Sequence, residues 1–127
     1  MGTRMTGTRR VVVVDDEPFI ARAVASALEA DGFEVTICEH WVGVANTIRT
    51  EEPHLVLLDY NMPTLKGDSI CSILKRNGAN KGMKIILFSS EAPGELVRIA
   101  AECGADGCIP KNTPSGDLVK RVRALTG

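Results

Sequence analysis

The sequence predicts an α/β fold of the (βα)5 type, in which five parallel strands form a doubly wound sheet of order 2-1-3-4-5. The first observation behind this prediction is that apolar runs alternate five times with segments whose apolar residues recur at helical spacing. The second is that the strongest runs are continuous stretches of Val, Ile or Leu, which are typical of strands buried on both faces. Right-handed crossovers leave few topologies, and this one places the first and third strands side by side.

The first strand is predicted at 11–14, a run of four valines. A helix follows it, because Pro18 suits the first helical turn and apolar residues recur behind it at helical spacing. The dipeptide Asp31-Gly32 then ends this helix. Residues 34–38 make a short second strand.

A second helix is predicted to end before Pro53. Its inward positions are Trp41, Val44, Ala45 and Ile48. The third strand is 55–58, a short apolar run that by itself does not exclude a buried helical turn. Met62-Pro63 follows, and because proline disfavours helix in the residue before it, the strand must open into a loop.

A third helix is predicted after Gly67, and it closes near Asn77-Gly78. Its inward positions are Ile70, Ile73 and Leu74. The apolar run 84–88 is the fourth strand, and it ends at a cluster of serines.

The remaining predicted elements are a fourth helix, a fifth strand and a last helix. Pro93 opens the fourth helix and Gly104 ends it. Its inward positions are Leu96, Ile99, Ala100 and Cys103. The fifth strand is the brief segment 107–109, and Thr113-Pro114 reads as an N-cap followed by proline at the first helical position. The stripe of the last helix consists of Leu118, Val122 and Leu125.

Length and composition are those of one globular domain, because 127 residues leave room for one core. The predicted strand order 2-1-3-4-5 is that of flavodoxin-like folds. A net charge of −1 gives no support for nucleic acid as a partner of this domain. No apolar run approaches the roughly 20 residues of a membrane span, so no membrane insertion is expected. Residues 1–9 lack the apolar centre of a signal peptide. We expect a disordered leader or expression remnant there, with the domain at 10–127.

The cysteines do not form a metal-binding pattern. They stand at Cys38, Cys71, Cys103 and Cys108, and no two of them make a Cys-x-x-Cys pair. A zinc site is therefore not expected, and the cysteines are interpreted as small apolar residues of a reduced, cytoplasmic chain.

Polar side chains collect where the predicted strands end. The set consists of Asp15, Asp16, Asp59, Ser89 and Lys111. Clustered carboxylates repel one another by about 4 kcal/mol per pair at ~4 Å and an effective dielectric near 20, and a divalent cation removes this cost. An all-oxygen site suits Mg²⁺ or Mn²⁺. A metal, a lysine and a hydroxyl together stabilise an anionic group with several oxygens, which is the chemistry of phosphoryl transfer.

Asp59 is the predicted nucleophile of this set, because it follows the buried third strand and aspartate is a known phosphoryl acceptor. The alternative is an aspartate that only caps a turn at the end of a strand. Taken alone, Asp59 favours that alternative, and the coincidence of polar residues at the other strand ends favours a site.

With these residues in place, the chain resembles a receiver domain of bacterial two-component response regulators, in the single-domain form of chemotaxis regulators. The resemblance covers about residues 10–126. Its motifs are Asp15-Asp16, Asp59-x-x-Met62-Pro63 with Gly67, Ser89-Ser90-Glu91-Ala92, and Gly104-Ala105-Asp106-Gly107 before Lys111.

The resemblance implies that Asp59 accepts a phosphoryl group from a histidine kinase or a phosphotransfer protein. It also implies that Ser89 hydrogen-bonds the phosphoryl group and that Lys111 pairs with it. The phosphorylated chain then acts on a downstream protein target by protein–protein contact. On this reading the protein catalyses only its own phosphorylation and dephosphorylation.

The resemblance further implies a Mg²⁺ or Mn²⁺ site. Asp16, Asp59 and the backbone carbonyl of Asn61 would hold the ion, and Asp15 would act mostly through a bound water. Asn61 and Glu91 stand two positions beyond Asp59 and the switch serine, where they are expected to border the path of the attacking water. We interpret both as residues that set the phosphoryl lifetime, the alternative being solvated loop residues.

Two positions depart from the family pattern. The family has proline directly after the lysine, in a cis bond, whereas this chain reads Pro110-Lys111-Asn112. A cis bond at Lys111-Asn112 would cost about 3 kcal/mol, so the bond is either trans in a different loop or cis at a cost. The second departure is Cys108, which stands where an aromatic residue often reports phosphorylation.

Two alternatives stay open beside the switch. The first is a phosphorylation-independent scaffold on the same fold, which the altered Lys111-Asn112 region does not exclude. An Asp-based phosphatase needs a second acid two residues after the nucleophile, and Asn61 at that position counts against it.

Overall fold

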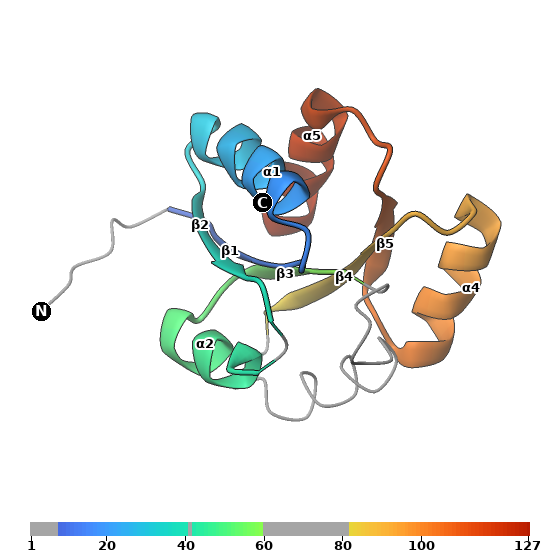
Figure 1. The fold of residues 1–127 in the computed structure, drawn as a ribbon, viewed down its shortest axis with the longest axis horizontal. Helices are drawn as coiled ribbons and strands as arrows, with labels where there is room; N and C mark the ends of the chain where they lie inside the picture. Colours follow the sequence, from blue (N-terminus) through green and yellow to red (C-terminus); the bar gives the residue numbers. More distant parts are fainter. Residues whose placement is uncertain (1–7, 41, 60–81) are drawn as a thin grey trace, which may run out of the picture.

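The computed structural model of the protein describes residues 8–40, 42–59 and 82–127. Its elements in chain order are β1 (Arg10–Val14), α1 (Pro18–Ala30), β2 (Glu34–Cys38), α2 (Val44–Glu51), β3 (Leu55–Asp59), β4 (Lys84–Ser89), α4 (Pro93–Cys103), β5 (Gly107–Pro110) and α5 (Ser115–Thr126). The strands form one parallel sheet of order β2-β1-β3-β4-β5 (Figure 1). The predicted fold class and strand order are confirmed.

Three strands run one residue further than predicted. Strand β3 ends at Asp59, β4 at Ser89 and β5 at Pro110. The reason is that pairing continues to these positions, since Asp59 is opposite Phe88 and Ser89 is opposite Pro110. Asp59 and Ser89 therefore belong to the sheet itself, and their positions are fixed by its hydrogen bonds.

The start of α5 was predicted one residue too early. The N-cap is Pro114, with an extended backbone at φ −57° and ψ 146°, and the helix begins at Ser115. Thr113 is therefore not the N-cap. Proline at 114 keeps the backbone extended for one more residue, and no side-chain hydrogen bond caps this end.

The start of α2 also differs from the prediction. The helix begins at Val44, after Gly43 at φ 92°, a left-handed conformation that glycine adopts without strain. Trp41, the first inward position predicted for this helix, lies outside the described residues, as does the predicted third helix after Gly67.

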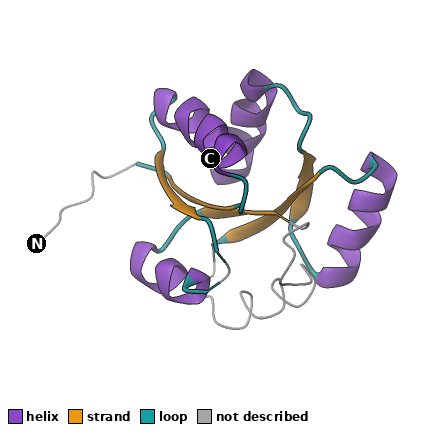
Figure 2. Cartoon of the chain, in the orientation of Figure 1, coloured by secondary structure: helices purple, strands orange, loops and turns teal. Residues whose placement is uncertain are grey.

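Helices cover both faces of the sheet (Figure 2). Helices α1 and α5 pack on one face, where a first apolar cluster contains Val11, Val13, Leu55, Leu57, Ile86, Phe88, Leu28 and Leu118. Helices α2 and α4 pack on the other, where a second cluster contains Val12, Val14, Val56, Leu58, Ile85, Leu87, Val44 and Leu96. Alternate strand residues enter different clusters because successive side chains point to opposite faces of a strand.

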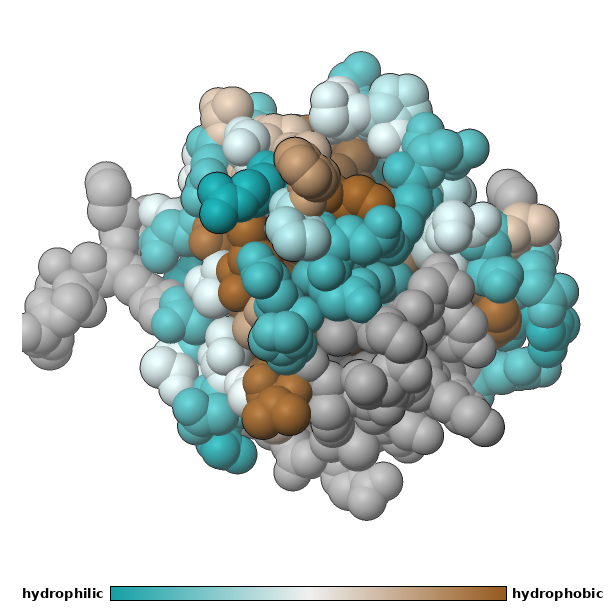
Figure 3. All heavy atoms as spheres, in the orientation of Figure 1, coloured by the Kyte–Doolittle hydropathy of each residue, from teal (hydrophilic) through white to brown (hydrophobic). Residues whose placement is uncertain are grey.

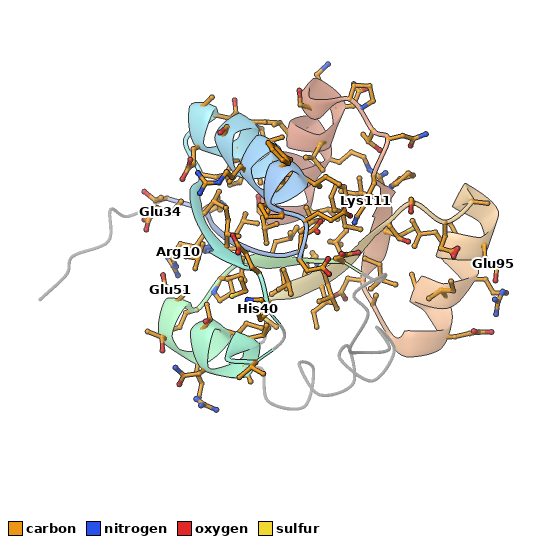
Figure 4. All side chains as sticks on the ribbon, in the orientation of Figure 1. Arg10, Glu34, His40, Glu51, Glu95 and Lys111 are labelled. Carbon is orange, nitrogen blue, oxygen red and sulfur yellow. The ribbon has the colours of Figure 1, made fainter. Side chains whose placement is uncertain are left out.

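The amino-terminal edge of the sheet, where the strands begin, is held by matched polar groups. The guanidinium of Arg10 donates from Nε to the Glu51 carbonyl at 2.9 Å and from Nη2 to the Glu52 carbonyl at 3.0 Å. A cation at the carboxyl end of α2 also suits the helix dipole. The backbone N–H of Arg10 donates to Nδ1 of His54 at 3.0 Å. Figure 4 shows Arg10, Glu34 and Glu51 gathered on the side of the view away from Lys111.

The same edge is held at β4 and β5 by Asp106. Its Oδ2 accepts the backbone N–H of Ile85 at 2.8 Å, and its own N–H donates to the Ile85 carbonyl at 2.8 Å. Asp106 therefore continues the sheet's hydrogen bonding before β5 begins.

The described surface on the face of Figure 3 is mostly hydrophilic, with hydrophobic residues between the polar ones. Large apolar side chains are most exposed at Phe19, Val42 and Val97. Within the described part of the chain, the helices are too short or too polar to cross a membrane.

Candidate functional site

The carboxyl-terminal edge of the sheet brings the predicted site residues together. Asp15 follows β1, Asp59 ends β3, Ser89 ends β4 and Lys111 follows β5. The first three are buried, with 0%, 1% and 0% of their surface exposed. Because β1 and β3 are neighbours, the carboxylates of Asp15 and Asp59 face the crevice that ligands use in such sheets.

Lys111 reaches this crevice although the proline comes before it. Its backbone N–H donates to the Ser89 carbonyl at 2.8 Å, so the sheet's pairing extends to the lysine. Every described peptide bond is trans, the one between Lys111 and Asn112 included. The Lys111 Nζ lies 3.1 Å from Asp59 Oδ1 and 3.4 Å from Asp15 Oδ2. The predicted lysine therefore stands beside the predicted phosphoryl acceptor.

An aromatic ring also contacts this lysine. The Lys111 Nζ lies 5.8 Å from the centre of the Phe88 ring. Phe88 is buried at the end of the first apolar cluster, so a fixed ring face is presented to the ammonium group.

Burial and charge change the acidity of two groups in the site. Burial is the main cause that raises the pKa of Asp15 to about 6, and the negative charge of Asp59 raises it further. Burial acts to lower the pKa of the Lys111 amine, but hydrogen bonds to Glu17 and Asp59 and the charge of Asp15 outweigh it and raise the pKa. The Lys111 amine is thus protonated at neutral pH, whereas the charged form of Asp15 is disfavoured.

The acidic residues fit a divalent cation. Carboxylate oxygens of Asp15, Asp16, Glu17 and Asp59 all lie within 4.8 Å of one another. The Asp15 Oδ2 is buried, and no described residue donates a hydrogen bond to it. A hard cation such as Mg²⁺ prefers oxygen ligands and would satisfy this atom. Asn61, whose backbone carbonyl was predicted as a further ligand, lies outside the described residues.

The loop after β4 is ordered by Ser89. Its hydroxyl oxygen accepts the backbone N–H of Glu91 at 3.2 Å. Glu91 is half-buried two residues beyond the serine, and Ser90 between them is exposed. The lifetime roles predicted for Glu91 and Asn61 stay predictions.

Glu17 is a site residue that the sequence analysis did not select. Its Oε1 accepts a hydrogen bond from the Lys111 Nζ at 3.0 Å, although 94 positions separate the two residues. The available signal was the acidic run Asp15-Asp16-Glu17 after β1, since a third acid at that strand end must lie near the same edge.

Two of the cysteines, Cys38 and Cys108, pack against apolar residues as predicted. Cys38 and Cys108 are free thiols, half-buried against the second apolar cluster. Burial raises the pKa of the Cys38 thiol, which keeps it protonated. The carbonyl of Cys108 accepts a hydrogen bond from Arg121 at 3.0 Å.

Comparison with known proteins identifies the family of this chain. A family model described as the response regulator receiver domain matches residues 11–123. The DNA-binding response regulator MtrA of Mycolicibacterium smegmatis is 31% identical over 119 residues, which make up 94% of this chain and 51% of that protein. The chain thus spans about half the length of the curated relatives it matches.

Solved structures of receiver domains have the same fold. The receiver domain of a response regulator from Bermanella marisrubri superposes with a TM-score of 0.83 at 29% identity, covering 94% of this chain and 99% of that one. The BeF3-activated N-terminal receiver domain of Klebsiella pneumoniae RstA gives a TM-score of 0.82 at 29% identity, covering 93% and 98%.

Proposed function

Because the chain belongs to the response regulator receiver domain family, which serves phosphorylation-dependent two-component signalling, we propose that Asp59 is its phosphorylation site. The observation that carries the proposal is the position of Lys111. Its ammonium group lies 3.1 Å from Asp59 Oδ1 at the edge of the sheet, and Asp59 is 1% exposed. A buried carboxylate with a fixed cation beside it is suited to accept a phosphoryl group.

In the proposed reaction, a carboxylate oxygen of Asp59 attacks the phosphorus of the donor in line with the leaving group. A phosphorus–oxygen bond forms to Asp59, and the bond from phosphorus to the donor's histidine nitrogen breaks. Lys111 stabilises the negative oxygens of the transferred group, and Ser89 provides a hydroxyl at the end of the neighbouring strand. The chemistry is positioning and charge neutralisation, as in other phosphoryl transfers.

Asp15, Asp16 and Asp59, with the carbonyl of Asn61, would hold Mg²⁺ or Mn²⁺ in this proposal. A bound cation would neutralise the clustered carboxylates and the negative charge of the phosphoryl oxygens. The observation that supports the ion most directly is that the buried Oδ2 of Asp15 accepts no hydrogen bond from a described residue.

The proposed partners are a histidine kinase or phosphotransfer protein as donor, and a downstream protein as target. The relatives named as DNA-binding regulators extend beyond the matched half, and we propose that this domain itself contacts protein and does not bind nucleic acid. Its proposed place of action is the cytoplasm, and its proposed catalysis is limited to its own phosphorylation and dephosphorylation.

The scaffold alternative depended on the altered order of Pro110 and Lys111. The hydrogen bond from Lys111 N–H to the Ser89 carbonyl brings the lysine to Asp59 in spite of that order. This contact supports the switch over the scaffold. The position that argued against a phosphatase, Asn61, lies outside the described residues.

The test is uptake of phosphoryl from acetyl phosphate in the presence of Mg²⁺, followed by intact mass spectrometry. The wild-type chain is expected to gain one hydroxylamine-sensitive phosphoryl group, and Asp59→Asn is expected to gain none because it lacks the nucleophilic carboxylate. The matched control is Asp117→Asn, an exposed position in the first turn of α5, which should label as the wild type does. Labelling of Asp59→Asn at the normal rate would overturn the assignment, and repeated phosphate release without a stable adduct would indicate a phosphatase.

A further inference from the structure

We propose that Glu17 is a positioning residue that holds the Lys111 ammonium group before phosphorylation and thereby slows phosphoryl uptake at Asp59. The inference rests on the function proposed above and adds a residue that lowers its rate. Glu17 competes with the incoming phosphoryl group for the Lys111 ammonium group.

Lys111 forms ion pairs with three described acids. Its Nζ lies 3.0 Å from Glu17 Oε1, 3.1 Å from Asp59 Oδ1 and 3.4 Å from Asp15 Oδ2. Glu17 thus makes the shortest of these three contacts, and its Oε1 accepts a hydrogen bond from the Lys111 Nζ.

Exposure separates Glu17 from the other two acids. Its side chain is 57% exposed, whereas those of Asp59 and Asp15 are 1% and 0% exposed and that of Lys111 is 9% exposed. The Glu17 carboxylate therefore lies on the solvent side of the lysine. A phosphodonor must enter from solvent, so it meets the Glu17 charge before it reaches the ammonium group.

The backbone of Glu17 is fixed, which leaves the side chain as the part that moves. Its N–H donates to Asp15 Oδ1 at 2.9 Å, and its carbonyl accepts the N–H of Ala21 at 3.0 Å as the first turn of α1 begins. A rotation about the side-chain bonds is enough to release Lys111. Because the glutamate is exposed, water solvates its carboxylate once it is released.

Removal of the Glu17 charge does not leave Lys111 without support. Asp59, Asp15 and the Phe88 ring still surround its ammonium group. The expected result of Glu17→Gln is therefore a lysine that stays in the site and is available to the phosphoryl group. An ion pair with one exposed partner is worth only a modest amount, so the expected gain in rate is about two- to fivefold.

A competing role must be separated from this one. Glu17 belongs to the four carboxylates whose oxygens lie within 4.8 Å of one another, so it is also near enough to bind a cation. If Glu17 bound Mg²⁺, Glu17→Gln would weaken the metal site and slow phosphorylation. The two roles thus predict opposite changes in rate.

The experiment compares phosphorylation rates of the wild type, Glu17→Gln and Glu34→Gln at saturating Mg²⁺. Glu34→Gln is the matched control, because it removes the same charge from an exposed position at the start of β2, away from Lys111 (Figure 4). The donors are dianionic acetyl phosphate and singly charged phosphoramidate. Glu17→Gln is expected to react faster with both, by a larger factor with acetyl phosphate, and Glu34→Gln is expected to match the wild type.

Two binding measurements complete the test. With Mg²⁺ present, BeF3 should bind Glu17→Gln about two- to fivefold more tightly than the wild type, because this phosphoryl mimic then meets no competitor for Lys111. The affinity for Mg²⁺ alone should not fall. An unchanged or slower phosphorylation rate in Glu17→Gln, or a loss of its Mg²⁺ affinity, would overturn the inference. The proposed function would still stand if the wild-type chain is labelled. A wild-type chain that accepts no phosphoryl group would overturn the proposed function itself.

Discussion

At the edge where the strands begin, charged groups meet partners of matching geometry. Arg10 donates to the carbonyls that end α2, and the Asp106 carboxylate accepts the N–H of a buried strand. At the edge where the strands end, Asp15 and Asp59 are buried close together around one lysine, and the Asp15 Oδ2 accepts no hydrogen bond from any described residue. The same sheet carries both arrangements.

The difference indicates which edge is organised for stability and which for reaction. Buried polar groups that are fully paired stabilise a fold, whereas a buried charge without a full set of partners destabilises it. Residues that weaken the free fold persist where a ligand later satisfies them. On the proposed function, a cation and a phosphoryl group would complete the carboxyl-terminal edge, whereas the described polar groups of the amino-terminal edge already have partners.

Removal of Asp106 is the prediction with the largest expected effect, and it tests the amino-terminal edge. Asp106→Ala should lower the free energy of unfolding by about 2–3 kcal/mol, because it leaves the N–H of the buried Ile85 unpaired. Chemical denaturation measures the loss. Asp106→Asn keeps an acceptor oxygen and should lose much less, and an equal loss in both variants would show that the hydrogen bond to Ile85 is not what secures this edge.

Removal of an acidic side chain's charge at the carboxyl-terminal edge should change the free energy of unfolding in the opposite direction. Asp15→Asn should raise the free energy of unfolding at pH 7 by about 1–2 kcal/mol in the presence of a chelator, because it removes a charge that burial disfavours. Thermal and chemical denaturation measure the gain. Mg²⁺ should then stabilise the wild type more than the variant.

The pH dependence of this gain follows from the raised pKa. The folded state keeps a proton on Asp15 up to about pH 6, whereas the unfolded chain releases it near 3.8. The stability from this group is thus complete below 3.8 and is lost as the pH rises through about 6. The advantage of Asp15→Asn should be absent at the acid end and complete above pH 6, and destabilisation by Asp15→Asn at pH 7 would break the comparison between the two edges.

The smallest effect on stability is expected at His54, which tests whether the amino-terminal edge also responds to pH. Burial, followed by the charges of Arg10 and Arg9, lowers the pKa of this histidine from its ordinary 6.5, and its Nδ1 must stay unprotonated to accept the Arg10 N–H. The folded state therefore binds a proton less readily than the unfolded chain, and stability falls as the pH drops below 6.5.

His54→Asn keeps an acceptor oxygen without a titratable ring, so it should remove this pH dependence. The expected difference is below ~1 kcal/mol, because the histidine is only half-buried and solvent screens its charge. Denaturation of the two proteins between pH 5 and pH 7 measures it. Parallel stability curves for the wild type and His54→Asn would show that this edge does not respond to pH through the histidine.

Sequence reasoning was most successful where chain direction alone places a residue. Parallel strands end at one edge, so Asp15, Asp59 and Ser89 were brought together by the strand order without any knowledge of side-chain contacts. The lysine was harder, because the order Pro110-Lys111 gave no certain loop. Backbone pairing from Lys111 to the Ser89 carbonyl resolved its position.

The missed features depend on rotamers and on backbone details that composition does not specify. The contact between Glu17 and Lys111 joins side chains 94 positions apart, and it forms where the segments that follow β1 and β5 meet at the carboxyl-terminal edge of the sheet. The pairing of Arg10 with His54 carries no motif, since neither residue type is unusual at a strand start. The late start of α5 follows from the extended backbone of Pro114.

The separation of the core into two layers has a consequence for how this sequence can change over time. Val13 and Leu57 share a layer with α1 and α5, whereas Val14 and Leu58 share the other layer with α2 and α4. A change of volume in one layer is relieved by neighbours in contact with it, because coupling between substitutions falls off for residues that share no partner. Compensating substitutions should therefore arise within a layer and seldom across the sheet. The helices of one face, α1 and α5, can then change in sequence independently of α2 and α4 on the other face.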